Sequence, residues 1–430
     1  MKIVVLILHI KCYNNGMVPY SRWYEARLRR FMVKPFVHIV FGARQTGKST
    51  LIKQLLPPDA LVINLSEPQE RMKYLSDPQE LIRTCRALKK TGEPRYVFID
   101  EVQMVPDLFN AIQSLYDADT TAFRFILCGS SARKLKTTGT NLLPGRSILH
   151  RLYPLINEEY NKEAIPFGEE FSPLALEPVP SRERFPERGL EDRLAFGDLP
   201  GIAALDDMEA RRELLKSYAA IHLEGEIRRE ASLRDLPAFL RFLKLAAIHS
   251  GSIVNQLGLS KEVGISAPTI RAYYQLLEDM FIGFTVPSFS GSEQKSIVSA
   301  GRFYFFDMGV RNAAAGIRID ESIISLDPGH FFEQWIGMIL YRKISYAGEG
   351  RLSHYRTRGG AEIDFILERN DEWIPIEVKW TQSPSMKDAR HLRAFLDDSK
   401  GRAKSAYIVC RCFRPQQLDE NITAIPWQML

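Results

Sequence analysis

The sequence predicts an α/β protein in which a parallel sheet with a phosphate-binding loop comes first and a second α/β unit comes last. Three observations predict this. The stretch Phe36–Leu51, FVHIVFGARQTGKSTL, joins an apolar run to a glycine-rich turn. A second apolar run, Tyr96–Ile99, ends in adjacent acids, and Tyr355–Trp380 contains two strand-like runs with charged residues between them. A chain of 430 residues exceeds the size at which one core usually stops growing, so we expect several domains.

Composition sets broad limits. The chain is 45% hydrophobic and 25% charged, and its net charge of +5 is compatible with nucleic acid without being diagnostic of it. The five scattered cysteines favour free thiols in a reducing cytoplasm over a disulfide framework. The first run, MKIVVLILHI, is far shorter than the ~20 residues that span a bilayer, so we expect a cytoplasmic protein without a membrane anchor. Either Met1 or Met17 could be the true start.

The turn after the first apolar run fits the pattern G-x-x-x-x-G-K-[ST] in full. The glycines permit turns in which backbone N–H groups point at an anion. Lys48 would contact the β- and γ-phosphates, Ser49 would bind Mg²⁺, and the helix that begins here presents its positive end. A chance Gly/Lys-rich turn is the alternative, which the flanking strand-like and helical runs disfavour. The residues expected to contact ATP are Gly42, Ala43, Arg44, Gln45, Thr46, Gly47, Lys48, Ser49 and Thr50.

The acids after the second apolar run complete this site. The continuous run Tyr96–Ile99 is typical of a parallel strand buried on both faces. Asp100 is placed to hold Mg²⁺, and Glu101 is placed to polarise the water that attacks the γ-phosphate. Ionised carboxylates are costly at the end of a buried strand without a cation, which favours this interpretation.

Neighbouring runs predict the rest of the first sheet. We expect strands at Ala60–Leu65 and Phe123–Ser131, a strand within Leu143–Leu155, and a helix at Asp77–Lys90 with Asp77 as N-cap and Pro78 at its first position.

Two kinds of side chain could assist catalysis. Ser130 or Ser131 could sense the γ-phosphate, with Ser131 our candidate, although a simple exit from the strand explains both. Arg146 and Arg151 could act as arginine fingers toward a neighbouring subunit, since developing charge on the transferred phosphoryl group needs a cation. Surface arginines are common, so the alternative is a solvated surface.

Phe41–Leu155 resembles the prokaryotic AAA+ ATPases that carry a C-terminal domain of uncharacterised function. The resemblance rests on FGARQTGKSTL, FIDEVQ, GSSARKL and GR-x(4)-RLYPL, and with later segments it covers nearly the whole chain. It implies an α/β ATPase core that uses ATP and Mg²⁺, and it names no substrate. Many AAA+ proteins work as rings, so a homo-oligomer is a further expectation, although no element of the sequence proves one.

The middle of the chain predicts helices. Prolines punctuate Ile156–Arg193, which we interpret as a linker. Helical patterns follow at Met208–Glu230 and Phe239–His249. Next, Leu259–Val263 and Ser266–Met280 have the spacing of a helix-turn-helix.

The strands Phe281–Val286 and Gly301–Phe306 would make this helix-turn-helix a winged helix. Thr269 and Arg271 could contact DNA, but the helix carries few basic residues and a packing module is the alternative. In the family resembled, this segment and FYFFDMGV are standard parts of the second domain.

The last motif lies in two expected strands, Glu362–Leu367 and Trp373–Lys379. Asp364 is followed 13 residues later by Glu377 in an E-x-K pattern, which resembles the PD-(D/E)xK nuclease superfamily. The resemblance implies that Asp364, Glu377 and a helical acid, Glu333, bind Mg²⁺, while Lys379 orients the nucleophile. A cross-strand salt-bridge ladder is the alternative, and a diverged member can keep the signature and lose activity.

Together these motifs predict an ATP-binding AAA+-type ATPase, with ATP-gated DNA cleavage as the specific extension. The alternative is an ATP-dependent regulatory or protein-interaction switch whose nuclease-like domain is a non-catalytic scaffold. The expected organisation is an N-terminal extension and helix (1–30), an ATPase domain (31–160), a linker (161–205), a helical and winged-helix module (206–300) and a nuclease-like domain (301–430).

Overall fold

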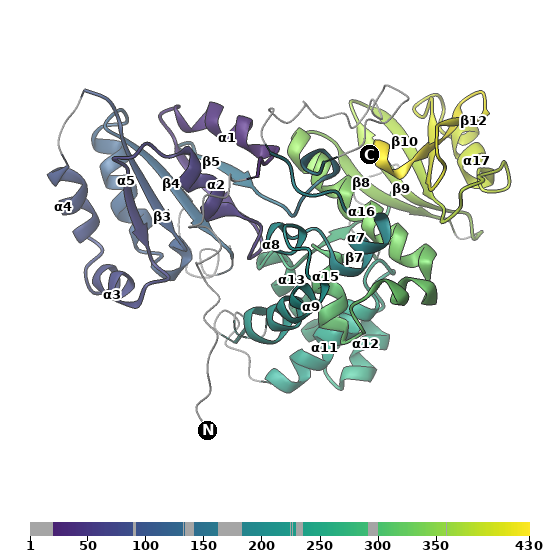
Figure 1. Cartoon of the computed structure of the whole chain (residues 1–430), viewed down its shortest axis with the longest axis horizontal. Helices are drawn as coiled ribbons and strands as arrows, with labels where there is room; N and C mark the ends of the chain where they lie inside the picture. The colour runs from purple at the N-terminus through teal and green to yellow at the C-terminus, as the bar shows by residue number, and fades with distance from the viewer. Residues whose placement is uncertain are drawn as a thin grey trace.

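Two sheets lie at opposite ends of the molecule, with helices between and below them (Figure 1). The computed structural model describes residues 20–88, 92–131, 133, 142–161, 183–223, 225, 227–228, 235–290, 300–357 and 359–430. The apolar run at the N-terminus lies outside these ranges. Within them, no helix is long and apolar enough to cross a lipid bilayer.

The first sheet is parallel throughout and has the strand order β2-β3-β4-β1-β5. Its strands are β1 Val37–Phe41, β2 Leu61–Asn64, β3 Arg95–Asp100, β4 Phe123–Gly129 and β5 Ser147–Arg151. The predicted strands are thus confirmed, each slightly shorter or longer than expected. Because β4 lies between β1 and β3 and all three strands are parallel, the residues that follow them gather at the C-terminal end of the sheet.

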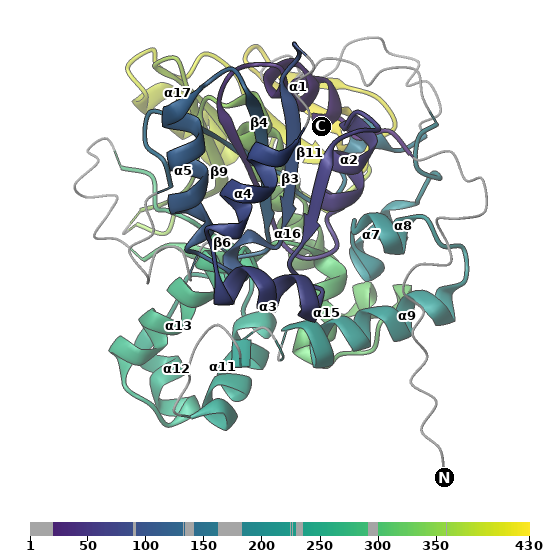
Figure 2. The same cartoon turned by 90° about the vertical axis from the view of Figure 1, so that its left-hand side faces the viewer.

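Helices cover both faces of this sheet (Figure 2). One face packs on α1 Tyr24–Met32 and α2 Lys48–Leu55. The other packs on α3 Pro68–Ser76, α4 Glu80–Ala87 and α5 Leu108–Ala118. Strand residues alternate between the two cores, as a strand period of two requires.

The prediction of a helix at Asp77–Lys90 is wrong about where the helix begins. Asp77 is the C-cap of α3, with the extended backbone angles φ −149° and ψ 91°, and α4 begins only at Glu80. The residue before a proline is disfavoured in helical conformation, so Pro78 breaks the helix between Asp77 and Glu80. The Asp77 side chain still accepts a hydrogen bond from the Gln79 N–H at 3.0 Å, but it does so within a turn.

The middle of the chain shares one large core with the C-terminal part. Its helices are α7 Leu190–Phe196, α8 Pro200–Ala203, α9 Met208–Ser217, a π-helix at Tyr218–Leu223, α11 Leu236–Ile248, α12 Gln256–Val263, α13 Ala267–Asp279 and α15 Met308–Ala315. The predicted linker is therefore too long, because α7 is buried in this core. Of the expected linker, residues 162–182 lie outside the described ranges.

The predicted helix-turn-helix elements are present. Helix α12 ends at Gly264, whose φ of +80° suits glycine, and the Ser266 side chain caps α13 by accepting from the Thr269 N–H at 3.3 Å. The antiparallel pair β6 Gly283–Val286 and β7 Arg302–Phe305 follows. That these elements form a winged-helix domain stays a prediction.

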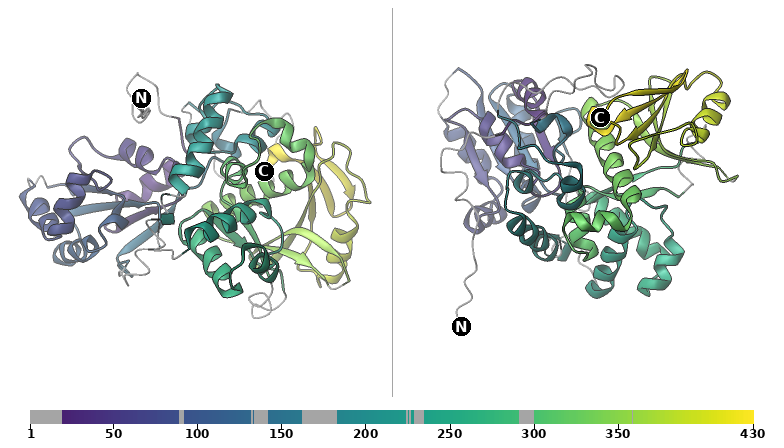
Figure 3. Two further views of the ribbon diagram at one scale, coloured as in Figure 1. Left: turned by 90° about the horizontal axis from the view of Figure 1, so that it is seen from below. Right: turned by 45° about the vertical axis from the view of Figure 1, so that its right-hand side comes forward.

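The second large sheet, coloured green to yellow in Figure 3, belongs to the C-terminal part of the chain. It is mixed and has the order β12-β13-β11-β10-β9-β8. Its strands are β8 Arg351–Arg356, β9 Glu362–Arg369, β10 Glu372–Val378, β11 Ala406–Cys410, β12 Gln416–Asp419 and β13 Ile422–Pro426. Helix α16, Pro328–Ala347, packs on one face and α17, Arg390–Asp398, on the other. Short 3₁₀ turns lie at Val102–Met104, Asn157–Glu159, Glu321–Leu326 and Trp427–Met429.

Candidate functional site

The phosphate loop connects β1 to α2 and has the backbone that its sequence predicts. A Cβ on Gly42 would lie 2.2 Å from the carbonyl oxygen of Leu152, so only glycine fits there. Gln45 and Gly47 both have left-handed angles, with φ of 61° and 87°. Helix α2 then starts at Lys48. The loop therefore curls tightly over the positive end of this helix, as an anion site requires.

Lys48 lies inside the loop. Its side chain is buried, and Nζ donates to the carbonyl oxygens of Gly42 at 2.9 Å and Ala43 at 2.8 Å. Burial lowers the pKa of Lys48. A buried cation whose partners are neutral carbonyls gains more from an anionic oxygen, because charge-assisted hydrogen bonds are the stronger kind. The ammonium group is thus prepared for a phosphate.

Arg22 supports the loop from behind, a role that the sequence analysis missed. Its Nη1 donates to the Thr46 carbonyl at 2.5 Å, and its Nη2 donates to the Tyr153 carbonyl at 2.8 Å. Its Nε pairs with Glu159 Oε1 at 2.7 Å, and both side chains are almost fully buried. One side chain just before α1 therefore joins the phosphate loop to the segment that leaves β5.

The two predicted Mg²⁺ ligands face a common thiol. Cys128 Sγ donates to Asp100 Oδ1 at 3.0 Å and lies 3.8 Å from Ser49 Oγ. Burial raises the pKa of Cys128 well above its ordinary value, so the thiol stays protonated and can keep donating. Asp100 Oδ1 also accepts from the Glu101 N–H at 3.1 Å. Ser49 and Asp100 thus converge, as predicted, with the sulfur between them.

Glu101 is held by two side chains beside this pair. Its backbone is left-handed, with φ 57°, at the point where β3 gives way to the 3₁₀ turn Val102–Met104. Gln103 Nε2 donates to Glu101 Oε2, and Ser130 Oγ donates to the same oxygen at 3.2 Å. Ser131 Oγ instead accepts from the Arg133 N–H at 3.1 Å. The structure therefore brings Ser130, not our candidate Ser131, against Glu101.

The two arginine candidates lie at opposite ends of strand β5. Arg146 directly precedes β5, at the end of the strands that lies opposite the phosphate loop. There its carbonyl accepts from the Val37 N–H, and its Nε pairs with Asp117 at 2.6 Å. Arg151 ends β5, with its guanidinium 5.9 Å from the ring centroid of Phe281. Arg146 could only serve the site of another subunit, so its role stays a prediction.

The C-terminal motif residues also converge. Phe365 pairs with Ile376 in the antiparallel register of β9 and β10, which sets Asp364 and Glu377 side by side. Asp364 Oδ2 accepts from the Val378 N–H at 2.8 Å, and Lys379 Nζ pairs with Glu377 Oε1 at 2.6 Å.

Burial dominates the electrostatics of these acids. It raises the pKa of Glu377 to about 7 and the pKa of Asp364. Glu333, on α16, has its pKa raised to about 8 by burial and by the charge of Asp364.

A cation that the sequence analysis missed enters this acid cluster. Arg302, on β7, forms ion pairs with Glu333 and Glu362 through its two terminal nitrogens. Among the described residues, no three His, Cys, Asp or Glu side chains are placed to hold a metal ion together. The predicted ligand set therefore does not fit a metal in this structure, because an arginine and a lysine already neutralise its carboxylates.

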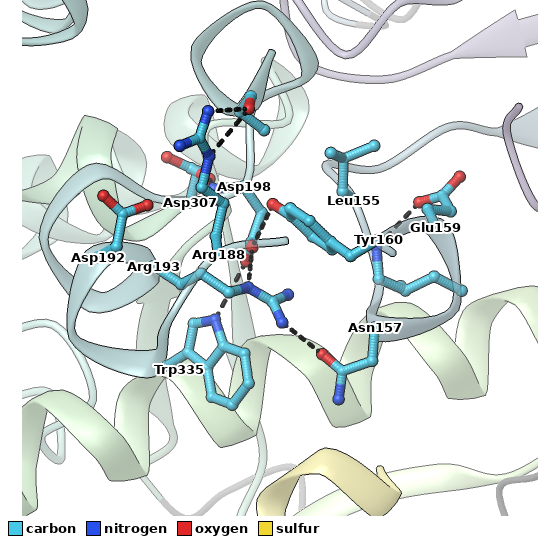
Figure 4. A network of polar contacts seen from close by, with 12 residues as sticks. Leu155, Asn157, Glu159, Tyr160, Arg188, Asp192, Arg193, Asp198, Asp307 and Trp335 are labelled. Atoms are coloured by element: carbon cyan, nitrogen blue, oxygen red, sulfur yellow. Dashed lines mark hydrogen bonds and ion pairs between the residues drawn. The ribbon is translucent and has the colours of Figure 1, made fainter. Parts of the chain in front are cut away.

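A buried polar network joins the segment that follows β5 to α7 and α16 (Figure 4). Asp198 accepts from Arg193 at 2.7 Å, Arg342 at 2.9 Å, Tyr160 at 3.0 Å and Trp335 at 3.1 Å. Although burial alone would raise it, the two arginines hold the pKa of Asp198 below its usual range. A fully buried carboxylate with four donors fixes the relative positions of the segments that supply them.

The strand order and the phosphate loop define a P-loop nucleotide-binding domain of the AAA type. The comparisons agree, since residues 34–161 match a family described as AAA domain. Residues 187–321 match a domain of unknown function (DUF8612), and residues 328–430 match another (DUF4143).

Similar proteins span most of the chain. An uncharacterized protein of Haemophilus influenzae is 23% identical over 88% of this chain and 90% of its own length. Uncharacterized proteins of Mycobacterium tuberculosis and Methanocaldococcus jannaschii are 24% and 22% identical, over 87% and 85% of this chain and 76% and 79% of their own lengths.

Solved structures add little. C. elegans PCH-2 matches with a TM-score of 0.22 and 19% identity, over 31% of this chain and 42% of that one. A protein from Vibrio cholerae matches with a TM-score of 0.18 and 13% identity, over 95% of this chain and 92% of that one. Both scores are too low to bear on the fold.

Proposed function

We propose that this protein binds Mg²⁺-ATP in the phosphate loop and hydrolyses the bond between the β- and γ-phosphates. The observation that carries the proposal is the convergence of four residues at the C-terminal ends of the parallel strands: Lys48, Ser49, Asp100 and Glu101. Lys48 would leave the loop carbonyls for the phosphates. The oxygen donors of Ser49 and Asp100 suit Mg²⁺, which prefers hard ligands and would neutralise charge on the β- and γ-phosphates.

Glu101 would position and polarise the attacking water. Gln103 and Ser130 fix its carboxylate by hydrogen bonds to Oε2, which leaves the other oxygen to accept from water. The carboxylate is assigned to water rather than to nucleotide, so Glu101→Gln should keep ATP affinity and lose turnover. Lys48→Ala should lose affinity itself.

The test is steady-state ATP hydrolysis together with equilibrium binding of a non-hydrolysable ATP analogue. Wild type, Glu101→Gln and Lys48→Ala are compared at one stated Mg²⁺ concentration. Turnover by Glu101→Gln equal to that of wild type would remove the proposed role of Glu101. Analogue binding by Lys48→Ala equal to that of wild type would remove the phosphate-loop assignment.

We further propose that ATP turnover drives a switch in which the C-terminal domain is a non-catalytic scaffold. Ion pairing of Arg302 with Glu333 favours this over DNA cleavage. The chain would work in the cytoplasm, and the AAA type makes a homo-oligomer the expected assembly.

DNA remains the rival partner. DNA-stimulated ATP turnover that disappears at high salt would favour a nucleic-acid machine, because phosphate contacts depend on salt. Metal-dependent cleavage of DNA that is lost in Asp364→Ala and Lys379→Ala, but kept in Lys48→Ala, would restore the nuclease extension. Turnover indifferent to DNA, with no cleavage, would support the switch.

A further inference from the structure

We propose that Arg302 takes the place of a divalent cation in the C-terminal acid cluster, so that the wild-type chain cannot take up a metal ion there. The cluster consists of Glu333, Glu362, Asp364 and Glu377. The proposal concerns metal binding alone and does not depend on ATP hydrolysis.

The guanidinium of Arg302 bridges two acids of the cluster. Arg302 is 5% exposed, and its two terminal nitrogens pair with carboxylates from different elements, Glu333 on α16 and Glu362 on β9. Bridging two carboxylates from separate segments is what a metal ion would do at this point. Arginine does so permanently, because its side chain stays charged at every pH that the fold survives.

The other two carboxylates of the cluster already have protein donors. Asp364 Oδ2 is taken by the Val378 N–H, and Glu377 Oε1 by Lys379. Glu377 is 7% exposed, and its second oxygen, Oε2, is buried without a hydrogen-bond partner. This oxygen marks where a ligand would bind if the cluster opened.

The balance of charge in the cluster also depends on Arg302. Four carboxylates face Arg302 and Lys379, and Arg356 Nε lies 3.9 Å from Glu362 Oε2. Removing Arg302 therefore leaves Glu333 without its partner and Glu362 with only the more distant Arg356. Buried carboxylates without a counter-ion are costly, and a divalent cation is the strongest available replacement. With Arg302 in place, a divalent ion would be repelled at short range by the guanidinium.

The experiment measures Mn²⁺ binding to the full chain without nucleotide, from the loss of the free Mn²⁺ electron paramagnetic resonance signal. Four proteins are compared: wild type, Asp364→Asn, Arg302→Gln, and the double variant Arg302→Gln/Asp364→Asn. Asp364→Asn separates this cluster from the phosphate loop, which all four share. Circular dichroism confirms that each variant is folded.

We expect Asp364→Asn to leave Mn²⁺ binding by the wild type unchanged. Arg302→Gln should bind Mn²⁺ at least tenfold more tightly than wild type, and the double variant should lose that gain. A fifth protein, Arg302→Lys, keeps the charge and should not gain the site.

Weaker Mn²⁺ binding in Asp364→Asn than in wild type would overturn the proposal, because it would show that the native cluster already takes a metal. Folded Arg302→Gln without any gain would overturn it as well. If Arg302→Gln does not fold, the comparison of wild type with Asp364→Asn still decides.

Discussion

Arg22 holds the phosphate loop from behind, and replacing it tests how far the loop depends on that side chain. Arg22 is 5% exposed and pairs with the fully buried Glu159 at 2.7 Å. Removing one partner of a buried pair costs about 3–5 kcal/mol, because the other charge is left uncompensated. Glu159 keeps two backbone N–H donors, Trp23 at 2.7 Å and Ile156 at 2.9 Å. We therefore expect Arg22→Met to lower the free energy of unfolding by about 3 kcal/mol, the low end of that range.

The same substitution should weaken ATP binding. In a trans peptide the C=O and N–H groups point in opposite directions. Arg22 Nη1 holds the Thr46 carbonyl at 2.5 Å, so the Gly47 N–H of the same peptide points away from Arg22, toward the inside of the loop. Inward N–H groups are what bind phosphate in such loops. We expect the Kd for ATP to rise about tenfold, equivalent to about 1.4 kcal/mol.

Urea unfolding gives the stability change, and titration with a non-hydrolysable analogue gives the affinity change. Arg83→Met is the matched control, because the Arg83 side chain is 58% exposed and its ion pairs lie at the surface. We expect it to lose only a small fraction of what Arg22→Met loses. Adding Glu159→Gln to Arg22→Met removes the stranded charge and should restore part of the stability. A loss no larger than that of the control, or an unchanged Kd, would refute the reasoning.

Three further predictions concern other buried groups. Cys128→Val puts a non-donating side chain between the two proposed Mg²⁺ ligands, and should raise the Mg²⁺ concentration needed for half-maximal ATP turnover; Cys128→Ser, which keeps a donor, should not. Burial lowers the pKa of His38 to about 4 and that of His150 to about 3. The unfolded chain therefore takes up protons below about pH 6.5 that the folded chain does not bind, and stability should fall by about 1.6 kcal/mol per histidine from pH 6.5 to 5. Chemical unfolding at several pH values should show a shallower fall for His150→Gln than for wild type. Asp198→Asn should cost about 3–5 kcal/mol, since its two arginine partners lose their shared carboxylate; an unchanged thermal midpoint would contradict this.

Local sequence was enough to predict the first sheet and the residues that follow its strands. The pattern of glycines, the apolar runs and the acids after Ile99 are all short-range signals, and the strand order then places them together. Two partners lay within reach of the same signals: Gln103 belongs to FIDEVQ, and Cys128 directly precedes GSSARKL. Their side chains could have been proposed as neighbours of Glu101 and Asp100 from strand order alone.

Other parts of the sites depend on contacts that no local pattern carries. Arg22 and Glu159 are separated by 137 positions, and Arg302 lies 31 and 60 positions from its two carboxylate partners. The motif of the C-terminal domain predicted which acids meet, but not which cation lies among them. For that reason the sequence favoured a metal site where the structure has an ion-pair cluster.

Helix α16 explains why the two sites should be considered together. Glu333, near its start, belongs to the acid cluster, and Tyr346, near its end, accepts the Tyr153 N–H through its hydroxyl at 3.0 Å. The Tyr153 carbonyl is the group that Arg22 holds while it also holds the phosphate loop. The helix has 20 residues and is buried along most of its length, so it spans about 30 Å as one rigid element. The structure thus provides a continuous packed path from the phosphate loop to Glu333, whereas Arg302 is carried by β7, a separate strand.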